Sequence, residues 1–311
     1  SFSHNGKYAA YAISRSGSDW EEFYVMNPQT GELLDDHIMW AKFSGAAWQG
    51  DGFYYSAYDA PVKGHEYSNV NAVQKIYYHK IGTPQSEDQL FYQNPANPMR
   101  FYSVSTNEDE TMMFLYESGA GSGNCVYVRD LRKPNSQFIQ MTSNLDLQYS
   151  LVQTIGDKMY FLTNDGAPKN RLMVADLKNP GVSAWKEVIP EGESVLEDVT
   201  FTNGKLILSY NKDACTHAYW CDMQGKNRKE IALPSGTASF YGKRDLAECF
   251  YSFSSFTTPG SIYQLDVNSG KASVYAAPKV AFDSKNFETK QVFFTSKDGT
   301  RVPMFLTFKK G

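Results

Sequence analysis

The sequence predicts an all-β fold, a β-propeller built from about six four-stranded blades. A two-part unit recurs every 44 to 53 residues, an apolar run followed by a short strand that ends in a polar turn. That interval is the length of one propeller blade. The composition agrees, because 15% of residues are aromatic and the 23 Gly and 13 Pro are spread along the chain, which favours strands joined by turns.

Each repeat can be marked by the second residue of its short strand. The markers are Tyr24, Tyr77, Tyr127, Met173, Tyr219 and Tyr263. Three residues after them come Asn27, Lys80, Asp130, Asp176, Asp222 and Asp266. Five of these six are Asn or Asp, whose side chains open tight turns by accepting a hydrogen bond from their own backbone. No window keeps the 3.6-residue apolar period of a helix, so we expect almost no helix.

The last part of the chain departs from the repeat. Six blade-like units end near residue 280, and residues 281–311 contain a hairpin signal at Lys297-Asp298-Gly299, then another strand and a basic end. We therefore predict a propeller over residues 1–296, and the start of a linker or strand into another domain over residues 297–311.

One interstrand segment, residues 58–74, is far longer than the 2 to 5 residues typical of a hairpin loop. Its Gly64 and mixed polar content suit a mobile lid at a binding surface. The alternative is that residues 58–74 form a surface loop without a function in binding.

Charge and composition exclude several function classes. The formal net charge is −4 with both signs interspersed, so we expect no nucleic acid partner. No stretch reaches the roughly 20 apolar residues that span a bilayer, so we expect no membrane partner. The four cysteines show no CxxC spacing and are predicted to be buried free thiols, with a bridge between Cys215 and Cys221 open in an oxidising compartment. The sequence leaves cytoplasm and periplasm open.

The search for catalytic motifs gives little. The GxSxG elbow of the α/β-hydrolases occurs nowhere, and the Gly/Ser-rich residues 117–123 are predicted to form a flexible loop. The five histidines lack any metal-ligand spacing, so neither metal nor cofactor is expected. The paired acids Asp35-Asp36 and Glu87-Asp88 are predicted to lie in solvated turns, since charged residues are mostly exposed.

Five segments carry a family resemblance. They are ISRSGSDW at 13–20, KFSGAAW at 42–48, QKIYYHKIGTPQSED at 74–88, SFSSFTTPG at 252–260 and TSKDGTRVPMF at 295–305. In this order they resemble the propeller of the prolyl oligopeptidases, serine peptidases of the S9 class, more than that of oligopeptidase B. The likeness runs through the whole chain.

The resemblance implies a seven-bladed propeller that caps an α/β-hydrolase catalytic domain of the same parent chain. That domain holds the Ser, Asp and His of the triad, so this chain alone is expected to be inactive. In the family the propeller is a gate and size filter, and the parent cleaves short proline-containing peptides after proline without a cofactor. Six repeats agree with seven minus one, and the missing blade would expose strand edges, so we expect a dimer or a partly open ring.

The resemblance also implies site residues. By motif, Phe43 lines the apolar wall near the substrate, and Asp19 pairs with a basic residue of the catalytic domain. Phe101 falls near a position where relatives carry Met. The alternative interpretation is that Phe43 and Phe101 are ordinary aromatic residues of the core and that Asp19 is an acidic residue of a turn. In the region matching residues 118–121 relatives can present an Arg and a Cys, and this sequence has neither.

The long loop at residues 58–74 matches a variable loop over the cleft in the family. Its candidate gating residues are His65, Tyr67 and Asn69. A free-standing propeller that binds peptide or protein partners is the rival interpretation. A propeller glycosidase is disfavoured, because no carboxylate pair is convincingly placed.

Overall fold

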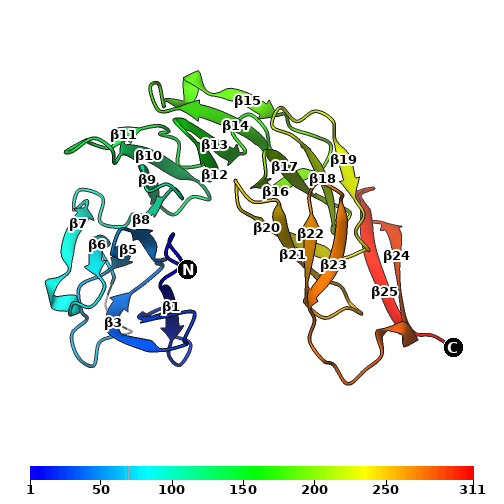
Figure 1. Ribbon diagram of the computed structural model, residues 1–311, viewed down its shortest axis with the longest axis horizontal. Coiled ribbons are helices and arrows are strands. Elements are labelled where there is room, and N and C mark those ends of the chain that lie inside the picture. Colours follow the sequence, from blue (N-terminus) through cyan, green and yellow to red (C-terminus); the bar gives the residue numbers. More distant parts are fainter. Residues whose placement is uncertain (67, 69) are drawn as a thin grey trace. The chain divides into compact units, whose positions relative to one another are not determined.

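The computed structural model describes residues 1–66, 68 and 70–311 (Figure 1). The described residues form strands and three short 3-10 helices, without an α-helix. The helices are η1 (Gln85–Glu87), η2 (Val182–Ala184) and η3 (Ser284–Asn286). The predicted all-β class and the near absence of helix are confirmed. Among the described residues, no helix is long and apolar enough to cross a membrane.

The chain divides into two compact units. Residues 1–149, 154–158 and 175–185 form the first unit, and residues 150–153, 159–174 and 186–311 form the second. Among the described residues, four sheets have the four strands predicted for a blade, and a fifth sheet has seven. The final two strands pair with each other in a sheet of their own.

The first predicted repeats share one seven-stranded sheet. Its strands are β1 (Ala9–Ser14), β2 (Glu21–Met26), β3 (Leu33–Ala41), β4 (Ala47–Gln49), β5 (Gly52–Ala57), β6 (Lys75–Lys80) and β7 (Gln89–Gln93). Their order is β1-β2-β3-β5-β6-β7, with β4 paired to β5. Only Ala41 and Ala57 pair between β3 and β5. The first repeat thus supplies three described strands and the second supplies four.

The remaining four repeats each form a four-stranded sheet. These sheets are β8 (Phe101–Thr106), β9 (Met112–Ser118), β10 (Asn124–Asp130), β11 (Ile139–Gln140); β12 (Tyr149–Ile155), β13 (Lys158–Thr163), β14 (Arg171–Asp176), β15 (Lys186–Ile189); β16 (Val195–Thr202), β17 (Lys205–Lys212), β18 (Cys215–Asp222), β19 (Lys229–Ile231); and β20 (Thr237–Gly242), β21 (Glu248–Ser254), β22 (Ser261–Asp266), β23 (Lys271–Ala276). In each sheet, neighbours in sequence are neighbours in space. This up-and-down order is that of a propeller blade.

The turn chemistry follows the prediction closely. The six markers lie in β2, β6, β10, β14, β18 and β22, the last strand but one of each repeat. After five of these strands a carboxylate or amide oxygen accepts the backbone N–H two residues on, at 2.8 to 3.1 Å. Local side-chain to backbone bonding therefore ends each of these strands at its predicted place.

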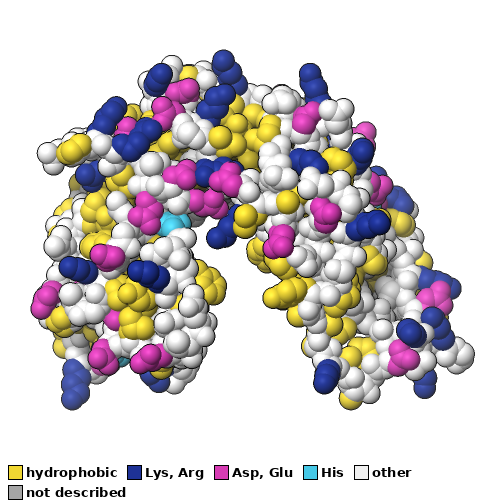
Figure 2. Space-filling view, in the orientation of Figure 1, with side chains coloured by type: hydrophobic (Ala, Val, Ile, Leu, Met, Phe, Trp, Pro, Cys, Tyr) yellow, Lys and Arg dark blue, Asp and Glu magenta, His cyan; other side chains and the backbone are white. Residues whose placement is uncertain are grey.

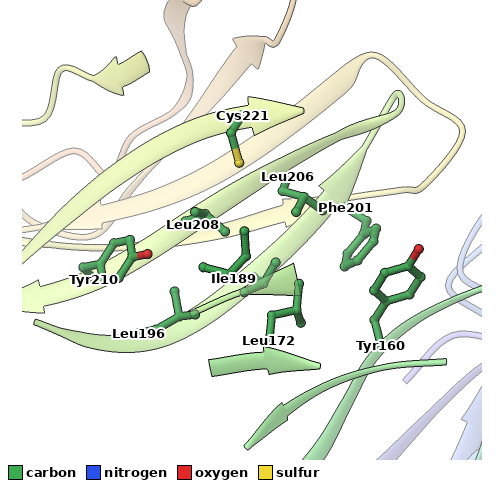
Figure 3. Close-up of a cluster of buried hydrophobic side chains, with 10 residues drawn as sticks. Tyr160, Leu172, Ile189, Leu196, Phe201, Leu206, Leu208, Tyr210 and Cys221 are labelled. Carbon is green, nitrogen blue, oxygen red and sulfur yellow. The ribbon is translucent and has the colours of Figure 1, made fainter. Parts of the chain in front are cut away.

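Apolar side chains between neighbouring strands form the cores. In the second unit one cluster joins β14 and β15 to β16, β17 and β18, and Figure 3 shows its side chains pointing toward a common centre. Leu172, Leu206 and Leu208 are fully buried there. Burial of apolar surface of this kind is the main favourable term in folding. All four cysteines are buried and free, as predicted, and Cys215 and Cys221 do not bridge.

The C-terminal segment forms a long hairpin, as its sequence predicts. β24 (Phe287–Thr295) pairs with β25 (Arg301–Lys309) along its whole length. Gln291 donates a hydrogen bond to the carbonyl of Asp213, at 2.5 Å, and the rings of Phe256 and Phe305 lie 5.3 Å apart. This hairpin crosses the predicted domain boundary at residue 296, and the boundary itself stays a prediction.

A buried polar cluster corrects one expectation. His79 of β6 is fully buried and lies between two carboxylates, with Nε2 2.9 Å from Asp36 and Nδ1 2.7 Å from Asp88. Asp36 also accepts the N–H of Gly82, and Asp88 accepts the hydroxyl of Tyr55. The two acids were predicted to lie in solvated turns, and that prediction is wrong, because a buried histidine from another strand gives both of them a partner.

Candidate functional site

The sequence-predicted aromatics come together at one hollow of the first unit. Phe43 lies between β3 and β4, and Phe101 opens β8. Their ring centroids are 5.5 Å apart at 88°, an edge-to-face contact. With Tyr102, Ser103 and Ser118 they line a hollow of about 340 Å³. Phe43 is 56% exposed, so it is not an ordinary core aromatic.

The backbone around Phe43 holds the ring in an unusual place. Phe43 has a φ of 53°, the left-handed region that a bulky side chain rarely adopts. Its neighbours are fixed: Gln74 donates to the carbonyl of Lys42 at 2.9 Å, and Ser44 accepts the N–H of Ser56 at 2.7 Å. Strain that the surroundings impose on an exposed ring is typical of functional sites.

Asp19, the acid that the sequence predicts at the site, lies near Phe43 through its contact with Lys42. Asp19 is 66% exposed, and its carboxylate is 3.5 Å from Nζ of Lys42. The side chain of Lys42 is 12% exposed, and its Nζ lies 5.1 Å from the ring of Trp20 and 5.4 Å from the ring of Phe43. Within this chain Asp19 therefore has a basic partner that the sequence reading did not identify. Its predicted pairing with another domain stays a prediction.

The long loop is anchored at both ends. Tyr58 is buried at its start, and Gln74 is fully buried at its end, where its side chain also accepts the N–H of Tyr102 at 2.7 Å. In between, the carbonyl of Glu66 accepts the indole N–H of Trp20 at 2.9 Å. The loop therefore contacts Trp20, the indole ring beside Lys42.

Of the candidate gating residues, the structure places His65. It is exposed, its backbone N–H donates to the carbonyl of Val62 at 2.9 Å, and its Nδ1 lies 3.3 Å from the hydroxyl of Ser68. Tyr67 and Asn69 lie outside the described residues.

An arginine from elsewhere in the chain occupies the region of residues 118–121, which itself contains no arginine. Arg100 precedes Phe101 in the sequence, and its guanidinium lies where a side chain at Gly119 would project. Its Nε is 3.8 Å from the carboxylate of Glu117. Sequence comparison by position missed it, because Arg100 comes from the start of the neighbouring strand. Only the glycine at position 119, which leaves room for the guanidinium, could have pointed to it.

The electrostatics of the site are mixed in sign. On the face shown in Figure 2, basic and acidic side chains are interspersed and neither sign forms a continuous patch. Near the hollow, burial raises the pKa of Tyr102 to about 12, so its hydroxyl stays protonated at physiological pH. Within the described part of the chain, no group of three or more His, Cys, Asp or Glu is suited to hold a metal ion.

Comparison with known proteins gives a consistent result. Residues 1–278 match the family model described as "Prolyl oligopeptidase, N-terminal beta-propeller domain". The whole chain is 37% identical to a prolyl endopeptidase of Elizabethkingia meningoseptica and 38% identical to one of Elizabethkingia miricola. In each case it covers 44% of the relative. The chain thus spans less than half the length of these relatives.

Solved structures agree. Prolyl oligopeptidase B from Galerina marginata, bound to a 35mer hydrolysis and macrocyclization substrate, superposes with a TM-score of 0.88 at 28% identity, over 99% of this chain and 46% of that one. A structure from a study of two prolyl endopeptidases gives a TM-score of 0.84 at 32% identity, over 99% of this chain and 45% of that one. Oligopeptidase B from Leishmania major, at 17% identity and a TM-score of 0.77 over 98% of this chain and 44% of that one, shares the fold.

Proposed function

The chain belongs to the prolyl oligopeptidase family, as its N-terminal β-propeller domain, and we propose that it gates a serine-type endopeptidase that cleaves short peptides after proline. The observation that carries this proposal is the match of the whole chain to two prolyl endopeptidases. The Ser, Asp and His of the triad are assigned to an α/β-hydrolase domain of the same parent, outside these 311 residues. On its own the chain is then inactive.

The propeller's contribution to substrate binding centres on the hollow at Phe43. Two phenyl rings at right angles present apolar area suited to a proline ring or another apolar side chain of a peptide. The guanidinium of Arg100 fills the space at Gly119, the residue after Ser118 of the hollow, and can donate to a peptide carbonyl. The propeller thus supplies an apolar wall and one donor, while the chemistry belongs to the other domain.

Asp19 is assigned to the contact between the two domains. Its carboxylate is mostly exposed and shares Lys42 at 3.5 Å, so it has acceptor capacity left for a second basic group. A pair formed across the interface would hold the domains closed. When the propeller and the catalytic domain are closed on each other, folded proteins are excluded and short peptides are admitted.

The loop at residues 58–74 is assigned as part of the gate. Its ends are held by Tyr58, whose ring packs against Trp20, and by Gln74, which bonds to Lys42. Between them, the carbonyl of Glu66 accepts the indole N–H of Trp20. One such hydrogen bond contributes about 1 kcal/mol, so the contact at Glu66 can open and close at low cost while the ends stay in place. Its exposed Val62 offers an apolar contact for a passing peptide.

The proposal is tested on the full-length parent with a blocked chromogenic substrate that carries proline before the leaving group. We expect activity that a serine-directed inhibitor abolishes, and none from the 311-residue chain alone. Phe43→Ala is expected to raise KM about tenfold with a smaller change in kcat, because it removes contact area shared by substrate and transition state. The matched control is Phe256→Ala, an exposed phenylalanine of the second unit.

Two results would contradict the proposal. A full-length parent without proline-specific activity would favour the free-standing binding propeller. If Phe43→Ala and Phe256→Ala leave KM equally unchanged, the hollow at Phe43 is not part of the substrate site.

A further inference from the structure

A second, smaller hollow of the first unit has a different character. It has a volume of about 150 Å³ and lies beside β2 and β3, where Trp20, Glu21, Trp40 and Glu66 contribute to its lining. The rings of Trp20 and Trp40 are 5.5 Å apart at 90° and so form a corner. The sequence reading assigned no role to Glu21, Trp40 or Glu66.

The unusual group in this hollow is the carboxylate of Glu21. Its Oε2 is buried and has no hydrogen-bond partner. Glu21 opens β2 on the same face as the buried Phe23 and Val25, because alternate residues of a strand share a face. Leaving a buried charged oxygen unpaired is costly. Glu21 also lines the hollow, so a cation that entered it would lie next to this carboxylate and reduce that cost.

The nearby cations of the chain are already engaged. Arg15 donates to Glu22 at 2.7 Å and to the hydroxyl of Tyr24 at 3.0 Å, and it is largely exposed. Lys42 pairs with Asp19. Neither forms an ion pair with Glu21 among the described residues. The hollow therefore keeps an uncompensated negative charge next to two indole rings.

Indole rings hold cations well. The nearby Nζ of Lys42 already lies 5.1 Å from the Trp20 ring centroid, which is cation–π distance. Trp40 has a φ of 61°, at an irregular point in the pairing of β2 with β3. A bulky side chain in this backbone region is strained, and the Trp40 ring lies perpendicular to that of Trp20.

We propose that Trp20, Trp40 and Glu21 form a subsite for an alkylammonium group carried by a peptide. The group is the side chain of a lysine or a free amino terminus. The indole rings contact its CH₂ groups and positive charge, and the carboxylate of Glu21 accepts its N–H. That the carrier is a peptide rests on the proposed function, whereas affinity for the alkylammonium group does not.

Titration calorimetry on the 311-residue chain tests this with three pentapeptides that lack proline and so are not cleavable after it. One is blocked at both ends with a central lysine, one is its blocked norleucine counterpart, and one is the norleucine peptide with a free amino terminus. We expect at least one ammonium-bearing peptide to bind about tenfold tighter than the neutral one, from cation–π contact together with a charged hydrogen bond. Which of them gains identifies the source of the ammonium group.

Two substitutions locate the effect. Glu21→Gln keeps the shape of the side chain and is expected to bring the ammonium peptides within about twofold of the neutral one, as loss of a charge-assisted bond predicts. Trp40→Leu is expected to do the same, with its fold checked by circular dichroism. Glu230→Gln, an exposed carboxylate on β19 of the second unit, is the matched control and should change nothing.

Equal binding of the three peptides to the unaltered chain would overturn the subsite. So would an ammonium preference that survives Glu21→Gln. Because binding is measured without hydrolysis, these results are independent of whether the parent proves to be a prolyl endopeptidase.

Discussion

The stability of the first unit is expected to depend on His79. Its ring lies between Asp36 and Asp88, and both carboxylates are at least 98% buried. When the ring is protonated, it donates to both of them. Replacing it with glutamine removes the cation between two buried acids, which costs about 3–5 kcal/mol in comparable buried pairs. We expect the lower end, about 3 kcal/mol, because Gly82 and Tyr55 still donate to these acids.

The cost depends on pH in a defined direction. Burial lowers the pKa of His79, but the hydrogen bonds to Asp88 and Asp36 and their charges outweigh burial, and the net pKa is raised. A group whose pKa is raised on folding contributes its full stability below its unfolded value, about 6.5. That contribution is lost as pH rises through the folded value. The difference between the unaltered chain and His79→Gln should therefore be largest near pH 6 and smaller at pH 9.

The assay is urea unfolding followed by tryptophan fluorescence at the two pH values. Four of the five tryptophans lie in the first unit, so the signal reports mainly the unit that contains His79. His217→Gln, which alters a half-exposed histidine of β18, is the control and should shift neither curve. A difference that stays constant or grows between pH 6 and pH 9 would show that protonation of His79 does not stabilise the fold.

Three further outcomes are expected. Leu208→Ala should destabilise the second unit by about 3 kcal/mol because it leaves a cavity in a buried cluster. A free energy of unfolding, measured by calorimetry, that stays within about 0.5 kcal/mol of the original value would contradict this. Burial raises the pKa of Cys221 and Cys249 to about 11, so their thiols should react with a disulfide reagent only after denaturation; rapid reaction of the native chain would show that they are accessible. Dimerisation through blade edges predicts a sedimentation coefficient that rises with concentration, and a constant monomer value would exclude it. Part of the edge of β1 is already hydrogen-bonded, because the N–H of Ala10 donates to the carbonyl of Ser1.

The sequence by itself determined the repeat, the strands and the turns. Asn27 and the four aspartates at the equivalent positions bond to their own backbone two residues on, so the chemistry that ends each of these strands is local and readable from neighbouring residues. The family resemblance then named Phe43 and Phe101, and these two rings do lie in contact. Their role in binding stays a proposal.

The tertiary structure alone decided which charged groups meet. His79 and Asp36 are 43 residues apart in sequence. Lys42, after the end of β3, meets Asp19, before the start of β2, because these two strands pair, and Arg100 fills the space beside Gly119. The first repeat's three strands and its joining to the second also follow from pairing across the sheet. Such contacts depend on how strands distant in sequence pack together, and burial then fixes which polar groups must pair. A single sequence carries no local signal for that choice.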